Sequence, residues 1–136
     1  MAKQRAQPKG THTDAGKDAL WKDFQSWLDE ARSTGWSVDR VLGDFQRFQQ
    51  RLWEIQEQEQ RIRFFDSLVD QLRHTCFPSL DSEQELKLLL WRGHAYETLG
   101  AWEQALEMFQ QVLELCRRKS SFYPYCSEAH LWIGHI

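Results

Sequence analysis

The chain has 136 residues, a formal net charge of −3 at pH 7 and a hydrophobic content of 41%. This length is typical of one domain, and the hydrophobic content is sufficient for a packed core. The small negative charge argues against a nucleic-acid partner, because such a partner needs a strongly basic surface. The sequence lacks a run of about 18 apolar residues that could span a membrane, and it lacks the apolar segment of a signal peptide.

The cysteines Cys76, Cys116 and Cys126 form an odd and sparse set. They predict reduced thiols in a cytoplasmic protein rather than a disulfide framework. Glycine and proline are scarce, and the alternation of apolar and polar residues that is typical of strands is absent. We therefore expect an all-α fold.

The N-terminal segment 1–16 contains several basic residues and almost no apolar ones. Such a composition cannot bury enough surface to fold, so we expect a disordered basic tail, with an arm for an acidic partner as the alternative. An amphipathic helix is predicted over residues 17–33, ending at Gly35. Its apolar residues recur at helical spacing: Leu20, Phe24, Trp27, Leu28 and Ala31.

A longer helical segment is predicted from Val38 to Thr75, with Ser37 as its N-cap. Apolar residues step by three and four along it, as in a coiled coil: Val38, Val41, Phe45, Phe48, Leu52 and Ile55, then Ile62, Phe65, Val69 and Leu72. The polar block 56–61 between these runs indicates a break or an exposed middle. This seam, residues 38–72, permits either self-association or packing within the chain.

Pro78 lies in a connector, 76–81, because proline disfavours helix at the preceding residue. The connector separates an N-terminal helical section, 17–76, from a second section, 82–136. The first section is expected to form a helical hairpin.

The second section begins with a predicted helix–turn–helix. Ser82 and Glu85 have the spacing of a capping box, so the first helix should begin there. Gly100 should end it, because glycine accepts the left-handed conformation at a helix terminus. Gly93 in mid-helix indicates a close approach of the second helix, near the small residue Ala105.

These helices resemble the tetratricopeptide repeat. The matching residues are Gly93 and Tyr96 in the first helix, Gly100, Trp102 and Glu103 at the turn, and Ala105 and Phe109 in the second helix. Leu89, Arg92, Val112 and Arg117 depart from the family pattern. The resemblance covers about one repeat and the start of a second, and it implies an α-solenoid fragment.

The end of the chain begins to repeat this unit. Residues 90–94 read LWRGH and residues 131–135 read LWIGH, an offset of 41 residues (134 − 93). A fixed period of this order is typical of stacked repeats. The last helix lacks a following partner helix, so we expect a fragment of a longer repeat protein, or a short protein whose last helix covers the repeat.

The resemblance implies a non-enzymatic scaffold or adaptor, which binds a peptide or helix of a protein partner in a concave groove. The residues implied to face that groove are Lys87, Leu90, His94, Glu97, Thr98, Leu131 and His135. A different interpretation is that the N-terminal helices cover Leu90 and Leu131, which would leave no groove open. The alternative function is oligomerisation through the seam.

Other chemistry has little support in the sequence. Possible metal ligands are His74, Cys76, Cys126, His130 and His135, but their spacing does not form two close pairs as in zinc sites. A cysteine–histidine nucleophile would need an orienting group and an oxyanion site, and neither has a recognisable motif. We therefore expect no catalytic residues, no metal and no cofactor.

Overall fold

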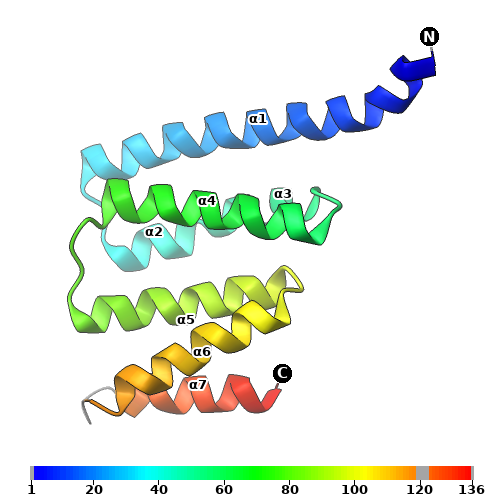
Figure 1. Ribbon diagram of the computed structural model, residues 1–136. Coiled ribbons are helices and arrows are strands. Elements are labelled where there is room, and N and C mark those ends of the chain that lie inside the picture. The colour runs from blue at the N-terminus through cyan, green and yellow to red at the C-terminus, as the bar shows by residue number, and fades with distance from the viewer. Residues whose placement is uncertain (1, 119–122, 136) are drawn as a thin grey trace. The chain divides into compact units, whose positions relative to one another are not determined.

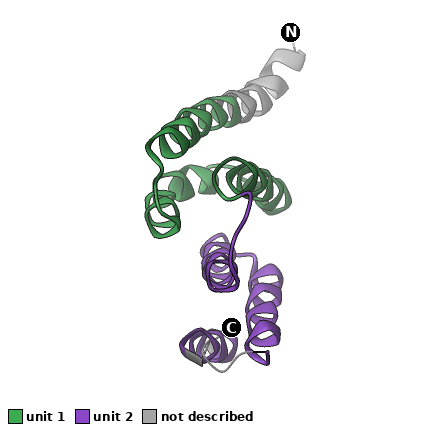
Figure 2. Ribbon diagram, turned by 90° about the vertical axis from the view of Figure 1, so that its left-hand side faces the viewer, with its two compact units in different colours: residues 1–77 green, residues 78–136 purple. Residues whose placement is uncertain are grey.

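The computed structural model describes the backbone of residues 2–118 and 123–135, and the side chains of residues 16–118 and 124–134. Within these residues the regular elements are all helices, which confirms the all-α prediction (Figure 1). They are α1 (Ala2–Thr34), α2 (Val38–Asp44), α3 (Gln46–Trp53), α4 (Gln58–Cys76), α5 (Ser82–Thr98), α6 (Trp102–Cys116) and α7 (Tyr123–His135). The chain divides into two compact units, residues 1–77 and 78–136, and the division falls within the predicted connector (Figure 2).

The first helix is longer than the sequence predicts. α1 is helical from Ala2, whereas a disordered tail was expected over residues 1–16 and a helix only from residue 17. Helix formation is cooperative, so a helix that has already formed extends readily, and the Ala, Lys, Gln and Arg residues of this segment favour helix. Pro8 and Gly10 oppose this extension, because proline lacks the backbone N–H and glycine has a low helix propensity. α1 ends as predicted at Gly35, whose φ is +74°.

The core of the first unit is aromatic. α1 packs on α3 and α4, and α2 contacts α3. The Phe24 ring centroid lies 6.0 Å from that of Phe45 and 5.6 Å from that of Phe48, and Phe45 lies 5.9 Å from Phe65. The seam therefore packs within its own unit and supplies its core, the second of the two possibilities given above. Its buried members are Val41, Phe45, Phe48, Leu52, Ile55, Phe65, Val69 and Leu72.

Two breaks interrupt the predicted segment 38–75. One separates α2 from α3 at Phe45, and the other separates α3 from α4 at residues 54–57, beside the predicted polar block. Arg61 holds the second turn: Nε donates to the Ile55 carbonyl at 3.1 Å, and a terminal nitrogen donates to the Gln56 carbonyl at 3.3 Å. Its guanidinium also lies 4.1 Å from the centroid of the Trp53 ring. The polar block therefore coincides with a break, one of its two predicted alternatives, and Arg61 within it is buried because its guanidinium supplies donors to the turn carbonyls.

The second unit consists of α5, α6 and α7. Its first helix begins one residue earlier than predicted: the N-cap is Asp81, not Ser82. The Gln84 backbone N–H donates to Asp81 Oδ1 at 2.8 Å, and the Asp81 backbone N–H donates to Gln84 Oε1 at 3.2 Å. The capping box is therefore Asp81 with Gln84, and an aspartate is as good an N-cap as a serine.

Candidate functional site

The helix pair α5–α6 is joined by a tight turn. α5 ends at Thr98 with Leu99 as its C-cap, and Gly100 follows with a φ of +78°, as the sequence predicts. The Ala101 backbone N–H donates to the Tyr96 carbonyl at 2.8 Å, which satisfies one of the last carbonyls of α5. In Figure 1, α6 runs back along α5, and α7 then runs in the direction of α5.

Gly93 brings the two helices together. A Cβ built on Gly93 would lie only 2.5 Å from Cε1 of Phe109 and 2.8 Å from its Cζ. The predicted close approach is therefore present, but the residue against Gly93 is Phe109, one helical turn beyond the expected Ala105. Ala105 itself is fully buried in the unit.

His94 joins all three helices of the unit. Its Nε2 lies 2.8 Å from Oε2 of Glu128 on α7. Its ring centroid is 4.7 Å from that of Trp132 on α7 and 5.4 Å from that of Phe109 on α6. With a side chain only one-third exposed, His94 serves as a packing residue between helices rather than as a free groove residue.

The other residues implied to line a groove do not form one surface. Leu90 is 5% exposed, so its side chain cannot be offered to a partner. Lys87 is half-buried and takes part in interactions of its own. Glu97 is half-buried, and one of its carboxylate oxygens lies buried without a hydrogen-bond partner. The groove as predicted is therefore wrong at Leu90.

Two of the implied residues are exposed. Thr98 is exposed, and its hydroxyl donates to the His94 carbonyl at 3.0 Å. Leu131 is 69% exposed on α7. His135 lies at the end of α7, but its side chain is outside the described residues.

An exposed strip runs along α7 through Ser127, Leu131 and Gly134. These residues are spaced by four and three, so they share one face of the helix. All three are exposed, and a Cβ built on Gly134 would meet no atom within 4 Å. Because serine and glycine are small, another helix could approach the α7 backbone closely on both sides of Leu131. We refer to these three residues as the α7 strip.

Cys116 and Cys126 form a disulfide, with their Cα atoms 5.9 Å apart. This overturns the prediction that the cysteines are reduced thiols. The prediction relied on the number and spacing of the cysteines, and neither reports that the end of α6 and the start of α7 come together. Cys76 remains a free thiol, and its burial raises its pKa, an effect that the positive charge of Arg32 partly offsets.

The first unit contains a surface hollow that the sequence did not predict. It has a volume of about 530 Å³ and lies between α1 and the α2–α3 segment, with Trp27 and Phe48 among its lining residues. Its polar side chains largely pair with one another. Asp23 and Arg51 are 2.6 Å apart, and the Trp27 indole N–H donates to Asp44 Oδ2 at 2.6 Å. These pairs stabilise the unit and leave the hollow with balanced charge.

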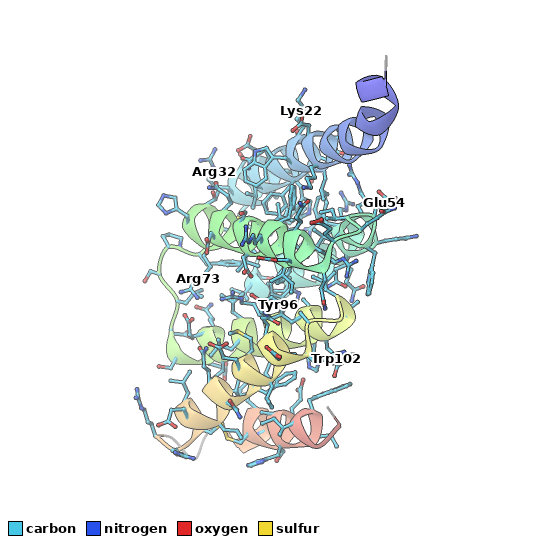
Figure 3. The ribbon with its side chains drawn as sticks, turned by 45° about the vertical axis from the view of Figure 1, so that its right-hand side comes forward. Lys22, Arg32, Glu54, Arg73, Tyr96 and Trp102 are labelled. Carbon is cyan, nitrogen blue, oxygen red and sulfur yellow. A yellow bond between two sulfur atoms is a disulfide. The ribbon has the colours of Figure 1, made fainter. Side chains whose placement is uncertain are left out.

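No three histidine, cysteine or acidic side chains come together as a metal site in the part of the chain that the structure describes. Among the helices of the same residues, none combines the length and apolarity that a membrane crossing requires. The exposed large apolar side chains of the described residues are Leu131 on α7, Trp102 at the start of α6, which is 52% exposed and labelled in Figure 3, and Trp53 at the end of α3.

Comparison with models of protein families, with curated proteins and with solved structures finds no match to this chain.

Proposed function

We propose that the chain is a non-enzymatic protein–protein interaction module, in which the α7 strip accepts an amphipathic helix of a protein partner. The observation that carries this proposal is a contrast between Leu90 and Leu131. The two leucines occupy the same position of the LWxGH repeat, yet Leu90 is 5% exposed and Leu131 is 69% exposed. The leucine side chain of the first LWxGH motif is therefore buried, and that of the second motif is exposed to solvent.

The arrangement of helices supports a repeat of the tetratricopeptide type. α5 and α6 form a helix–turn–helix with a close contact at Gly93, and α7 contacts both of them. In a stacked repeat each unit contacts only its neighbours, so the last helix of a stack has one face that no further repeat covers. An apolar residue left open on α7 is therefore a site where another helix would bury surface.

The polar residues around the strip suggest what the partner offers. His130 precedes Leu131 and is exposed, and Glu128 is half-exposed while its carboxylate pairs with His94. We expect a partner helix with an apolar residue against Leu131, small residues facing Ser127 and Gly134, and polar residues at the edge. The surface described here has neither the basic character of a nucleic-acid site nor a helix suited to a membrane.

The burial of the seam side chains disfavours the alternative function, oligomerisation through the seam. A coiled coil needs the seam side chains at the surface of the chain, but Phe45, Leu52 and Val69 are each 0% exposed within it. Self-association would therefore require the first unit to open.

We keep the cytoplasm as the proposed location, although two of the three cysteines are paired and not reduced. Disulfides of cytoplasmic proteins are usually transient or redox-sensing. This location therefore requires the Cys116–Cys126 disulfide to be exchangeable.

Selection of displayed helical peptides on the full chain would test the proposal. Selected peptides should bind the wild-type chain and lose about ten- to a hundredfold in affinity with Leu131→Asp, since a buried leucine contributes about 1.5–3 kcal/mol. Leu131→Met should retain binding, because it preserves the apolar contact. Trp102→Ser, which removes an exposed aromatic side chain from α6, is the matched control and should also retain it. Peptides that bind Leu131→Asp as tightly as the wild type would refute the proposed site.

A further inference from the structure

The Cys116–Cys126 disulfide lies beside a small hollow. The hollow has a volume of about 290 Å³ and is lined by Leu113, Cys116, Arg117, Cys126 and His130. Both cysteines are half-buried, so the disulfide lies neither in the core nor fully at the surface. A hollow of this volume is at the lower limit for ligand pockets, which suits a molecule of a few residues rather than a folded partner.

The two sulfur atoms occupy opposite helix ends. Cys116 is the last residue of α6, and Cys126 lies in the first turn of α7, which has 13 residues. A helix carries partial positive charge at its N-terminus and partial negative charge at its C-terminus. A thiolate is therefore stabilised at Cys126 and destabilised at Cys116, so the disulfide has a better and a worse leaving group.

Arg117 is the residue with a formal charge among those that line the hollow. Arg118, which is also exposed, follows it in the sequence. Glu114 is the carboxylate nearest to Arg117, at 3.1 Å, but both side chains are largely exposed, so water screens the pair. Arginine presents several donors to a carboxylate even while it contacts another. An anionic molecule is thus favoured over a cationic one.

From these observations we propose that the Cys116–Cys126 disulfide is a thiol-exchange site for a small anionic thiol of the glutathione class, and that the incoming sulfur joins Cys116 while Cys126 leaves. The incoming thiolate attacks Sγ of Cys116, the S–S bond breaks, and its electron pair remains on Sγ of Cys126 as a thiolate. A second thiolate then attacks the mixed disulfide, which releases the oxidised small molecule and the Cys116 thiolate. Two small thiols are oxidised and one protein disulfide is reduced.

The order of attack can be read directly from the intermediate. The full chain carrying Cys76→Ser, which removes the third thiol, is treated with reduced glutathione at neutral pH, and free thiols are alkylated after short times. Peptide mapping by mass spectrometry should find glutathione on Cys116 and the alkyl group on Cys126. Glutathione predominantly on Cys126, or no mixed disulfide until the chain is unfolded with urea, would overturn the proposal.

Single-cysteine chains give an independent measurement of the same asymmetry. In the Cys76→Ser background, Cys126 of the Cys116→Ser variant should be alkylated several-fold faster at neutral pH than Cys116 of the Cys126→Ser variant. Circular dichroism of both variants checks that the helices remain, and alkylation in urea gives the reference rate of each thiol. Equal rates in the folded chains, or a faster Cys116, would contradict the assigned leaving group.

The preference for an anionic thiol has its own test. Arg117→Glu should slow exchange with glutathione but leave exchange with the uncharged 2-mercaptoethanol unchanged, and Arg117→Gln should have an intermediate effect. An equal effect on both thiols would show that Arg117 acts on the disulfide itself rather than on the incoming anion, and would refute the proposed ligand class.

Discussion

The ring of Phe109 occupies the space in which a side chain at Gly93 would have to begin. A Cβ at Gly93 would be 2.5 Å from Cε1 of Phe109, far closer than two carbon atoms can approach without displacement. In an unconstrained helix, replacing glycine by alanine stabilises by about 1 kcal/mol. At Gly93 we expect the opposite sign.

Gly93→Ala should destabilise the second unit by about 1–3 kcal/mol, because the added methyl forces Phe109 out of its position. Urea denaturation followed by circular dichroism measures the change. Gly134→Ala is the matched control, since its added Cβ meets no atom within 4 Å, and it should leave stability unchanged or slightly increased. Combining Gly93→Ala with Phe109→Leu should recover part of the loss, and a double variant no better than the sum of the singles would count against the contact.

Asp81→Ala should cost about 1 kcal/mol, because its carboxylate accepts from the Gln84 backbone N–H at the start of α5. Ser82→Ala should change the free energy of unfolding by less than about 0.5 kcal/mol, since Ser82 is a surface residue of the first turn. Parallel urea titrations of the two variants show whether the N-cap is Asp81, as in the structure, or Ser82, as predicted from the sequence. A larger loss for Ser82→Ala would place the cap where the spacing of Ser82 and Glu85 predicted it.

Arg61→Leu should destabilise the first unit by about 1–3 kcal/mol. The substitution leaves the carbonyls of Ile55 and Gln56 without the donors that Arg61 provides, and it removes the guanidinium stacked on Trp53. Arg63→Leu is the control: Arg63 pairs with Glu59 across two largely exposed side chains, and such pairs contribute little. Tryptophan fluorescence during urea denaturation follows both variants, and equal effects would mean that Arg61 is not holding the turn.

The Cys76 thiol should react slowly with iodoacetamide. Burial raises its pKa, so between about pH 7 and 9 a smaller fraction is thiolate than in the unfolded chain. Arg32→Ala should slow the reaction further, because the Arg32 charge lowers that pKa. The rate is measured in the Cys116→Ser/Cys126→Ser background, with urea-unfolded protein as the reference, and a folded chain that reacts as fast as the unfolded one would contradict this account.

The raised pKa of Cys76 also makes the stability of the folded chain depend on pH. Because the folded chain favours the neutral thiol, its contribution to stability is complete below the pKa of the unfolded thiol. It decreases as pH rises through that value, since the unfolded chain then ionises more readily than the folded one. Cys76→Ala should therefore reduce the loss of stability at alkaline pH.

Sequence patterns predicted the elements whose causes are local. The stop signals Gly35 and Gly100 both have positive φ, and the helical class follows from apolar spacing. The break near the polar block was also predicted, as one of two alternatives, but the role of Arg61 was not, because the sequence does not report which donor reaches the turn carbonyls.

What the sequence left open depends on contacts between distant residues. The spacing of the seam residues is compatible both with self-association and with packing inside the chain. The contacts of Phe24 with Phe45 and Phe48 show that the seam packs inside the chain. Leu90 and Leu131 share one motif position but differ in exposure, so repetition alone could not assign both to a groove. The disulfide likewise requires two helix ends to meet.

The turn between α5 and α6 has a consequence for how the second unit assembles. Only Leu99, Gly100 and Ala101 separate the two helices, so their first contacts close a very small loop. Small loops lose little chain entropy on closure, and proteins dominated by such neighbours reach their native state quickly. We therefore expect the α5–α6 hairpin to form early and α7 to dock on it.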